Sequence, residues 1–175
     1  ELGARHAGDV AMLCDIARPD VVVVTNVGLA HLEVFGSWDV IVEASAEPVR
    51  SLASDGTAVL SADDLVVAGY TELTAGTVVT FGRSAGADVR AEAIQLDPEG
   101  LAAFELVEVT GRSRVQLRVP GEHMVLNALA AAAVGSVLGV DIAEQAEALG
   151  SASVSRWRME RFETPGGVRV LNPFL

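Results

Sequence analysis

The arrangement of apolar residues in the first half of the chain constrains the fold most, because it alternates between a helical and a strand period. Residues 10–17 place apolar side chains on one helical face, and Val21–Val24 follow as a continuous β-branched run. A second helical pattern covers 38–52, and strand-like runs follow at 57–60 and 77–81. Strands that alternate with helices predict parallel β-α-β units. We expect an α/β fold in which Val21–Val24 is buried on both faces.

The middle of the chain has a different pattern, because apolar and polar residues alternate there. Val115, Leu117 and Val119 are separated by polar residues, which predicts a strand with one solvated face. With the less regular runs before it, this strand predicts an antiparallel meander from about Val89 to Val119, packed beside the parallel strands. The other expected elements are flanking helices over 64–73, 126–138 and 141–150 and a hairpin over 161–172.

Composition excludes several classes of protein. The chain has 175 residues, 50% of them hydrophobic, and one cysteine, so a disordered chain, a disulfide framework and a cysteine-only metal site are excluded. We expect that cysteine, Cys14, to be a small buried residue. The net charge of −12 argues against nucleic acid as a partner, and no apolar run approaches the ~20 residues of a membrane span. All 12 basic residues are arginine, which excludes any chemistry that needs a lysine ammonium.

Polar residues follow the expected strands, where ligands gather in open α/β sheets. Glu1 opens the segment Glu-Leu-Gly-Ala-Arg-His; it is a candidate Mg²⁺ ligand or a solvated terminus. His31 is the last residue of Thr-Asn-Val-Gly-Leu-Ala-His, the segment that follows the valine strand. It is a candidate contact for a ligand or a metal, or an ordinary loop histidine whose hydrogen bonds are satisfied within the protein. Asp63 lies in Ser-Ala-Asp-Asp, where it contacts a ligand or caps the next helix. The spacing of the three histidines argues against a zinc site.

A second set of polar residues lies in the last third of the chain. His123 and Asn127 are four residues apart and share a face near the start of an alanine-rich helix, where polar ligands bind well. Ordinary helix capping and packing is the alternative explanation for both residues. Arg156, Arg158 and Arg161 form a short basic cluster that suits either a phosphate group or surface ion pairs.

In their order along the chain, these motifs resemble the Mur ligase family, and the resemblance covers essentially the whole sequence. The motifs are Glu-Leu-Gly-Ala-Arg-His at 1–6, Thr-Asn-Val-Gly-Leu-Ala-His-Leu at 25–32 with Phe-Gly-Ser at 35–37, Ser-Ala-Asp-Asp at 61–64, Phe-Gly at 81–82, Gly-Glu-His at 121–123 with Asn-Ala-Leu-Ala-Ala at 127–131, and Arg-Met-Glu at 158–160. The Arg-His pair and the spacing from Ala-His-Leu to Phe-Gly-Ser are most similar to the MurF branch.

The resemblance implies a particular enzyme. Residues 1–160 would be most of the central, ATP-binding domain of a three-domain ligase, and 161–175 a hairpin leading toward a C-terminal domain. In that branch ATP phosphorylates the terminal carboxylate of UDP-N-acetylmuramoyl-tripeptide, and D-alanyl-D-alanine then attacks the acyl phosphate. The resemblance thus implies a role in peptidoglycan synthesis, and we expect a cytoplasmic monomer.

The resemblance also implies roles for single residues. Glu1 and His31 match the metal ligands of the family, with His31 also catalytic, so that Mg²⁺ would bridge the phosphates of ATP. Asn127 matches a residue that contacts the adenine end of the nucleotide, and Arg158 one that contacts its phosphates. His123 is carried over as a residue that lines the nucleotide pocket.

The sequence departs from the family in three ways. The Gly-rich phosphate loop and the UDP-sugar domain are absent, the chain stops after the final hairpin, and Ser45 stands where the family usually has a carbamylated lysine. Ser45 lies on the inward face of helix 38–52, which Pro48 is expected to kink or divide. A hydroxyl cannot supply the missing carboxylate, and Glu43 and Glu47 are the nearest candidates to replace it. We expect a fragment that does not catalyse ligation alone.

Three alternatives remain beside the MurF-type ligase. A degenerate, noncatalytic relative would bind a nucleotide or a partner. Folylpolyglutamate synthase is a related enzyme that the Arg5-His6 context disfavours. A dinucleotide-dependent dehydrogenase is disfavoured because no G-x-G-x-x-G segment is present.

Overall fold

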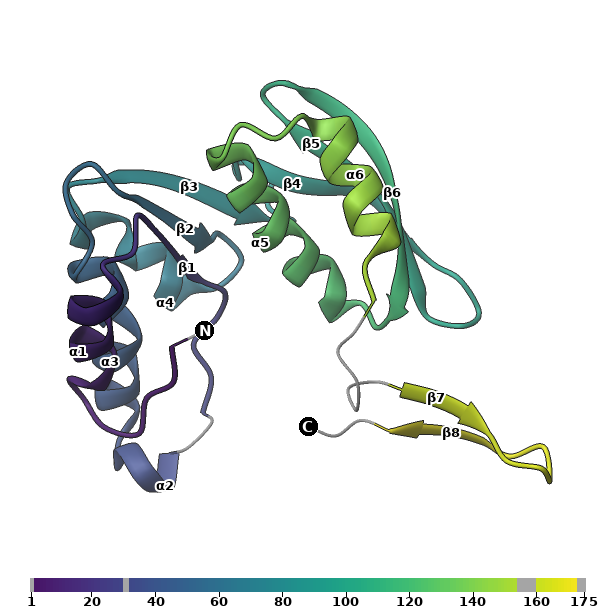
Figure 1. Cartoon of the computed structure of the whole chain (residues 1–175), viewed down its shortest axis with the longest axis horizontal. Coiled ribbons are helices and arrows are strands. Elements are labelled where there is room, and N and C mark those ends of the chain that lie inside the picture. Colours follow the sequence, from purple (N-terminus) through teal and green to yellow (C-terminus); the bar gives the residue numbers. More distant parts are fainter. Residues whose placement is uncertain (1, 30–31, 154–159, 173–175) are drawn as a thin grey trace.

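One six-stranded sheet organises the chain (Figure 1). The computed structural model describes residues 2–29, 32–153 and 160–172. The strands lie side by side in chain order, and pairs from β1 to β4 are parallel whereas β4, β5 and β6 are antiparallel. Their bounds are β1 Val21–Val24, β2 Thr57–Ser61, β3 Thr77–Gly82, β4 Val89–Leu96, β5 Leu101–Glu108 and β6 Gly111–Pro120. The expected α/β fold is therefore confirmed, and the meander continues the parallel sheet instead of forming a separate layer.

Helices cover the two parts of the sheet separately. The first group lies around β1 and β2, with α1 packed on α3, and the second group packs on β2 to β6 (Figure 1). The first group is α1 Asp9–Ala17, α2 Leu32–Phe35, α3 Trp38–Arg50, α4 Leu65–Ala68 and the 3₁₀ helix η1 Gly69–Leu73; the second is α5 His123–Val137 and α6 Ile142–Ser151. The expected final hairpin is present as β7 Glu160–Glu163 and β8 Arg169–Asn172. Within the described residues, no helix has both the length and the apolar composition that a membrane crossing requires.

The core has two parts on opposite faces of β2. Ala58 and Leu60 pack with β1, α3 and η1, whereas the residue between them, Val59, packs with α5 and the antiparallel strands. The alternation of side chains along a strand explains this division. The larger cluster contains Phe104 and Leu129, both fully buried. Cys14 is buried as expected, and burial raises the pKa of its thiol.

The expectation that Val21–Val24 is buried on both faces is wrong. Val22 and Val24 pack into the core beneath α3, but Val23 between them is 41% exposed. The physical reason is that Val23 points to the same face as its strand partner Val59, and among the described residues α5 packs on that face over β2 to β4 rather than over β1. A continuous β-branched run predicts the strand but cannot reveal its place in the sheet.

Two residues, a proline within a helix and an alanine within a strand, depart from the regular geometry expected of their elements. Pro48 does not divide α3: the helix continues through it and ends two residues later at Arg50, although Pro48 has no N–H to donate to the Ala44 carbonyl. Ala93 has φ 52° within β4, beside a register shift between Glu92 and Gln95. This geometry marks a β-bulge where the meander begins to twist away from the parallel strands.

Candidate nucleotide and metal site

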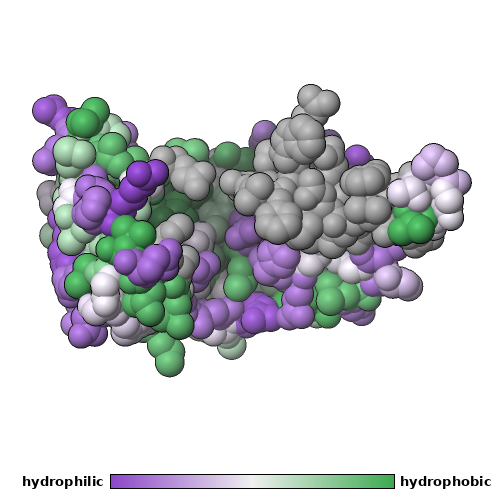
Figure 2. All heavy atoms as spheres, turned by 90° about the horizontal axis from the view of Figure 1, so that it is seen from below, coloured by the Kyte–Doolittle hydropathy of each residue, from purple (hydrophilic) through white to green (hydrophobic). Residues whose placement is uncertain are grey.

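A cavity of about 710 Å³ lies along β1, from Pro19 before the strand to the loop after it. Leu2 and Ala4 line it together with the loop 25–28 that follows β1, and Ser45 lines it from α3. On the side where α2 lies, the surface is hollowed beside the part of the molecule that holds α1 and α3, and apolar side chains line the recess (Figure 2). Ser45 is half-buried here, which confirms its expected inward direction.

The two expected metal ligands, Glu1 and His31, lie outside the described residues, as does Arg158. Within the residues that the structure describes, no group of three or more His, Cys, Asp or Glu side chains could hold a metal ion. The segments next to Glu1 and His31 in the sequence do line the same cavity, through Leu2 on one side and Gly28 on the other.

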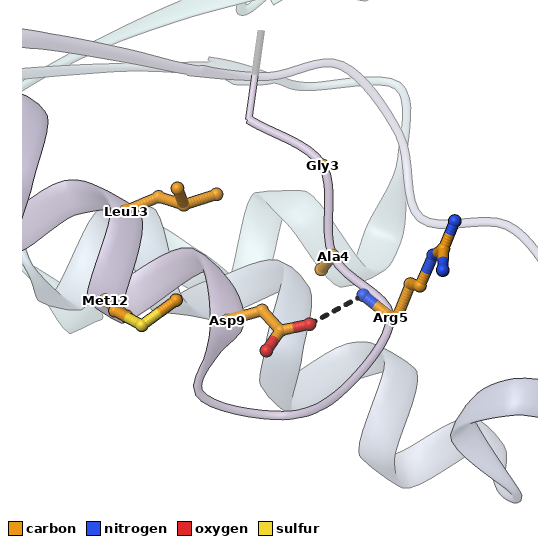
Figure 3. Close-up of a pocket in the computed structure, with 6 residues that line it drawn as sticks. All are labelled: Gly3, Ala4, Arg5, Asp9, Met12 and Leu13. Carbon is orange, nitrogen blue, oxygen red and sulfur yellow. Dashed lines mark hydrogen bonds between the residues drawn. The ribbon is translucent and has the colours of Figure 1, made fainter.

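The loop that leads into α1 is held by the carboxylate of Asp9. Its Oδ2 atom accepts hydrogen bonds from the backbone N–H groups of Arg5 at 2.9 Å and His6 at 2.8 Å (Figure 3). These two bonds hold the pKa of Asp9 below its usual value. A pocket of about 420 Å³ adjoins this loop, and the Arg5 side chain points away from Met12 and Leu13, which line it (Figure 3).

The two carboxylates expected to replace the missing lysine group already have other partners. Glu47 accepts from the backbone N–H groups of Gly8 at 2.5 Å and Ala11 at 3.0 Å. Glu43 accepts from the Arg50 guanidinium at 2.7 Å on the exposed side of α3. Glu47 is thus engaged by the start of α1, whereas Glu43 is held by an exposed ion pair.

The two aspartates after β2, Asp63 and Asp64, accept hydrogen bonds from different segments. Asp64, not Asp63, caps α4, because its Oδ1 accepts from the N–H groups of Val66 and Val67. The expectation that Asp63 caps this helix is wrong by one residue, because α4 begins at Leu65 and its cap position is 64. The other oxygen of Asp64 accepts from Val27 N–H at 2.9 Å, which ties the loop after β1 to the loop after β2.

Asp63 instead holds the loop after β3. It accepts from the N–H groups of Arg83 and Ser84 and from the Ser84 hydroxyl at 2.8, 3.0 and 2.7 Å. Burial raises the pKa of Asp63, but these bonds and the nearby Arg83 charge outweigh it, so the pKa lies below its usual value. The Arg83 guanidinium also contacts Glu122 at 2.6 Å, directly before α5. Arg83 thus links the ends of β2 and β3 to the start of α5, a role that no sequence signal indicated.

The start of α5 presents His123 and Asn127 on its exposed side. Among the described residues, the carboxamide nitrogen of Asn127 donates to the Met124 sulfur at 3.5 Å, and the side chain is exposed. The His123 ring lies directly over Gly121, which has φ +115°, and a Cβ there would collide with the ring. The backbone angle favours glycine at 121, whereas the exposed His123 ring could turn aside from a Cβ.

Comparisons with known sequences identify the family. Residues 1–135 match the model of the Mur ligase middle domain. The UDP-N-acetylmuramoyl-tripeptide–D-alanyl-D-alanine ligase of Mycobacterium tuberculosis strain H37Rv is 42% identical over 173 residues, or 98% of this chain. The ligase of the same name from Bacillus subtilis is 28% identical over 173 residues, again 98% of this chain. The chain spans about a third of the length of these relatives, 34% and 36%.

Solved structures give the same result. MurF from Acinetobacter baumannii superimposes with a TM-score of 0.90 at 32% identity, over 98% of this chain and 37% of that one. MurF ligase from Thermotoga maritima, solved in complex with ADP, gives a TM-score of 0.79 at 28% identity, over 98% of this chain and 39% of that one. The family model covers most of the chain and the superpositions nearly all of it, so this chain belongs to the Mur ligase family, as a middle domain.

Proposed function

We propose that this chain is the ATP-binding part of a ligase that adds D-alanyl-D-alanine to UDP-N-acetylmuramoyl-tripeptide. The observation that carries the proposal is the 42% identity, over 98% of the chain, to a ligase of that name. Residues 1–160 would form the central domain and 161–175 the start of the connection to a following domain. Because UDP-linked precursors and ATP occur in the cytoplasm, we propose that location, and a monomer.

The proposed nucleotide contacts use the exposed start of α5. Asn127 would bind the adenine end through its outward carboxamide, His123 would line the pocket, and Arg158 would contact the phosphates. The weakly engaged Asn127 side chain fits such a role, since an unused amide offers both a donor and an acceptor. The relative solved with ADP supports a nucleotide at this fold.

The proposed metal ligands are Glu1 and His31. Their neighbours Leu2 and Gly28 line one cavity, which supports a shared site at this edge of the sheet. Mg²⁺ bound there would neutralise the charge on the phosphates during transfer. Asp9 accepts from the N–H groups of Arg5 and His6, which follow Glu1 in the sequence, and Asp64 accepts from Val27 N–H, which precedes His31.

A specific observation favours a second candidate, a noncatalytic relative that binds nucleotide. Ser45 replaces the carbamylated lysine of the family, and Glu43 and Glu47 are both engaged elsewhere. If no other carboxylate fills this place, phosphate transfer would be slow. Losing one charge-stabilising group typically reduces the rate by ~100- to 1000-fold.

Phosphate release from ATP by the complete reading frame distinguishes the two candidates. The ligase predicts release that requires both UDP-N-acetylmuramoyl-tripeptide and D-alanyl-D-alanine, and that Asn127→Ala weakens through a higher KM for ATP. The noncatalytic relative predicts nucleotide binding with no such release. Ser45→Lys is expected to raise the rate and make it depend on bicarbonate, and an unchanged rate would mean that another group replaces the lysine. Residues 1–175 alone are expected to show no turnover.

A further inference from the structure

The loop after β3 is fixed at its first end by the Asp63 carboxylate. This carboxylate accepts from the N–H groups of Arg83 and Ser84, and the Ser84 hydroxyl adds a third bond. A Cβ on Gly82 would lie 2.6 Å from Asp63 Oδ1, an oxygen that both Ser84 bonds hold in place, so glycine suits this close approach. The backbone that carries Arg83 is therefore held against the end of β2.

The other end of the same loop is fixed by Asp88. Its carboxylate accepts from the N–H and the hydroxyl of Thr80 at 2.8 and 2.6 Å, and Asp88 N–H donates to the Thr80 hydroxyl oxygen at 3.0 Å. Ala87 N–H also donates to Ser84 C=O at 3.0 Å, which closes a turn within the loop. Because both ends are held, the Arg83 side chain leaves the main chain from a fixed place.

From this loop the Arg83 side chain reaches the start of α5. Its guanidinium contacts Glu122 at 2.6 Å and lies 3.6 Å from Asp63. Glu122 directly precedes α5 and makes no capping hydrogen bond with its side chain. Among the described residues, one cation thus lies between two carboxylates, one at the end of β2 and one at the start of α5.

The Arg83–Glu122 pair should matter more for charge than for stability. Both side chains are about half exposed, and exposed ion pairs contribute little to folding because water and salt screen them. Val125, which is fully buried, already holds this end of α5 on the sheet. What Arg83 changes most is therefore the charge at the start of α5, next to His123 and Asn127 in the sequence.

We propose that Arg83 is a positioning residue of the nucleotide site, which draws the Glu122 carboxylate onto the loop after β3 and offsets its charge. The inference rests on the proposed function, in which His123 and Asn127 bind ATP. The chain has a net charge of −12 and a triphosphate is itself anionic, so an unbalanced carboxylate at the start of α5 would repel the ligand. Arg83 acts through Glu122 and does not touch the nucleotide.

Equilibrium binding of ATP to the complete reading frame tests this charge balance. Arg83→Gln leaves Glu122 unbalanced and should raise the Kd for ATP about fivefold to tenfold at low salt, with a smaller rise in 1 M salt. Glu122→Gln removes the carboxylate charge instead and should bind ATP at least as tightly as the wild type. The double variant has the same net charge here as the wild type, so its Kd should return to within about twofold of the wild-type value.

Two controls separate the charge of the site from its fold. Adenosine lacks the phosphates, and its affinity, measured by competition, should change less than about twofold in all three variants. Arg114→Gln removes an arginine of similar exposure that is paired with Glu105 on the sheet, so it changes the net charge equally and should leave ATP binding within about twofold.

Two patterns would refute the proposal while ATP binding by the wild type still supports the proposed function. Equal weakening of ATP and adenosine in Arg83→Gln would mean that Arg83 only supports the fold at the start of α5. Weak ATP binding that persists in the double variant would mean that Arg83 contacts the nucleotide directly. If the wild type binds no ATP, the proposed function fails, and the proposal for Arg83 fails with it.

Discussion

The loops around β1–β3 and the solvent face of β4–β6 are both rich in acidic residues, but their carboxylates have different partners. In the parallel part, the carboxylates of Asp9, Glu47, Asp63 and Asp64 accept from backbone N–H groups of loops and helix ends. In the antiparallel part, Glu92 lies between Arg90 and Arg112, and Glu105 lies opposite Arg114.

The difference follows from how each part satisfies its backbone. Antiparallel neighbours joined by short turns pair most of their N–H groups with each other, so side chains on the wet face are free to pair by charge. Parallel strands need long connections, whose N–H groups must find other acceptors. Replacing an acid should therefore cost more around β1–β3 than on the face of β4–β6.

The largest loss of stability should come from a substitution in the core that packs on the antiparallel strands β4–β6. This substitution also tests whether β1–β3 and β4–β6 unfold independently. Phe104→Ala should lower the free energy of unfolding by about 3–5 kcal/mol, because a fully buried aromatic ring leaves a cavity. Urea unfolding measures the loss, and Val109→Ala, at a fully exposed position, is the control. If the amides of β1–β3 stay protected when those of β4–β6 open, the two parts are separate folding units.

The next largest loss of stability is expected for one aspartate of the parallel part, which we compare with one aspartate of the antiparallel part. Asp64→Ala should cost about 2 kcal/mol, the upper end for a helix cap, because Val27 N–H loses its acceptor as well. Asp97→Ala removes an acceptor from the turn between β4 and β5, where it binds the N–H groups of Glu99 and Leu101. Because that turn lies between paired strands, about 1 kcal/mol is expected there. Equal losses in urea unfolding would contradict the comparison.

Tyr70 offers a spectroscopic test of the parallel part. Its hydroxyl donates to Val42 C=O at 2.6 Å, and burial, with the Asp64 and Glu43 charges, raises its pKa to about 12. The unfolded pKa is about 10, so the stability from neutral Tyr70 is present below pH ~10 and is lost as the pH rises toward ~12.

Because Tyr70 is the only tyrosine, the absorbance of tyrosinate reports it directly. Tyr70→Phe should cost about 1 kcal/mol at neutral pH and flatten this alkaline loss of stability. A titration midpoint near 10 in the folded protein would show that the hydroxyl is not held as described.

The smallest effect should come from the face of β4–β6. Glu105→Gln removes the partner of Arg114, whose guanidinium lies 3.6 Å from the carboxylate and is half exposed. The expected loss is below about 1 kcal/mol, and it should vanish in ~1 M salt, where exposed charges are screened. A double-mutant cycle with Arg114→Ala measures the pair. A larger, salt-resistant coupling would mean that the acids of this part also support the fold.

Much of the architecture was predictable, because it depends on local patterns. The valine run at 21–24 and the alternation at 115–119 predicted strands, and the helical period placed Ser45 on the inward face of α3. The order of short motifs predicted the family, which the comparisons confirm. The place of His123 and Asn127 near the start of α5 was predicted as well, and their roles toward a nucleotide stay predictions.

Sequence alone therefore determined the element order, the fold class and the family, since each depends on period, spacing or motif order. Only the tertiary structure decided that Val23 is exposed, that Asp64 rather than Asp63 caps α4, and that Glu47 anchors the loop before α1. The physical reason is distance along the chain. A loop N–H takes whichever acceptor the fold brings near it, and Gly8 and Glu47, 39 residues apart, meet only when α1 packs on α3.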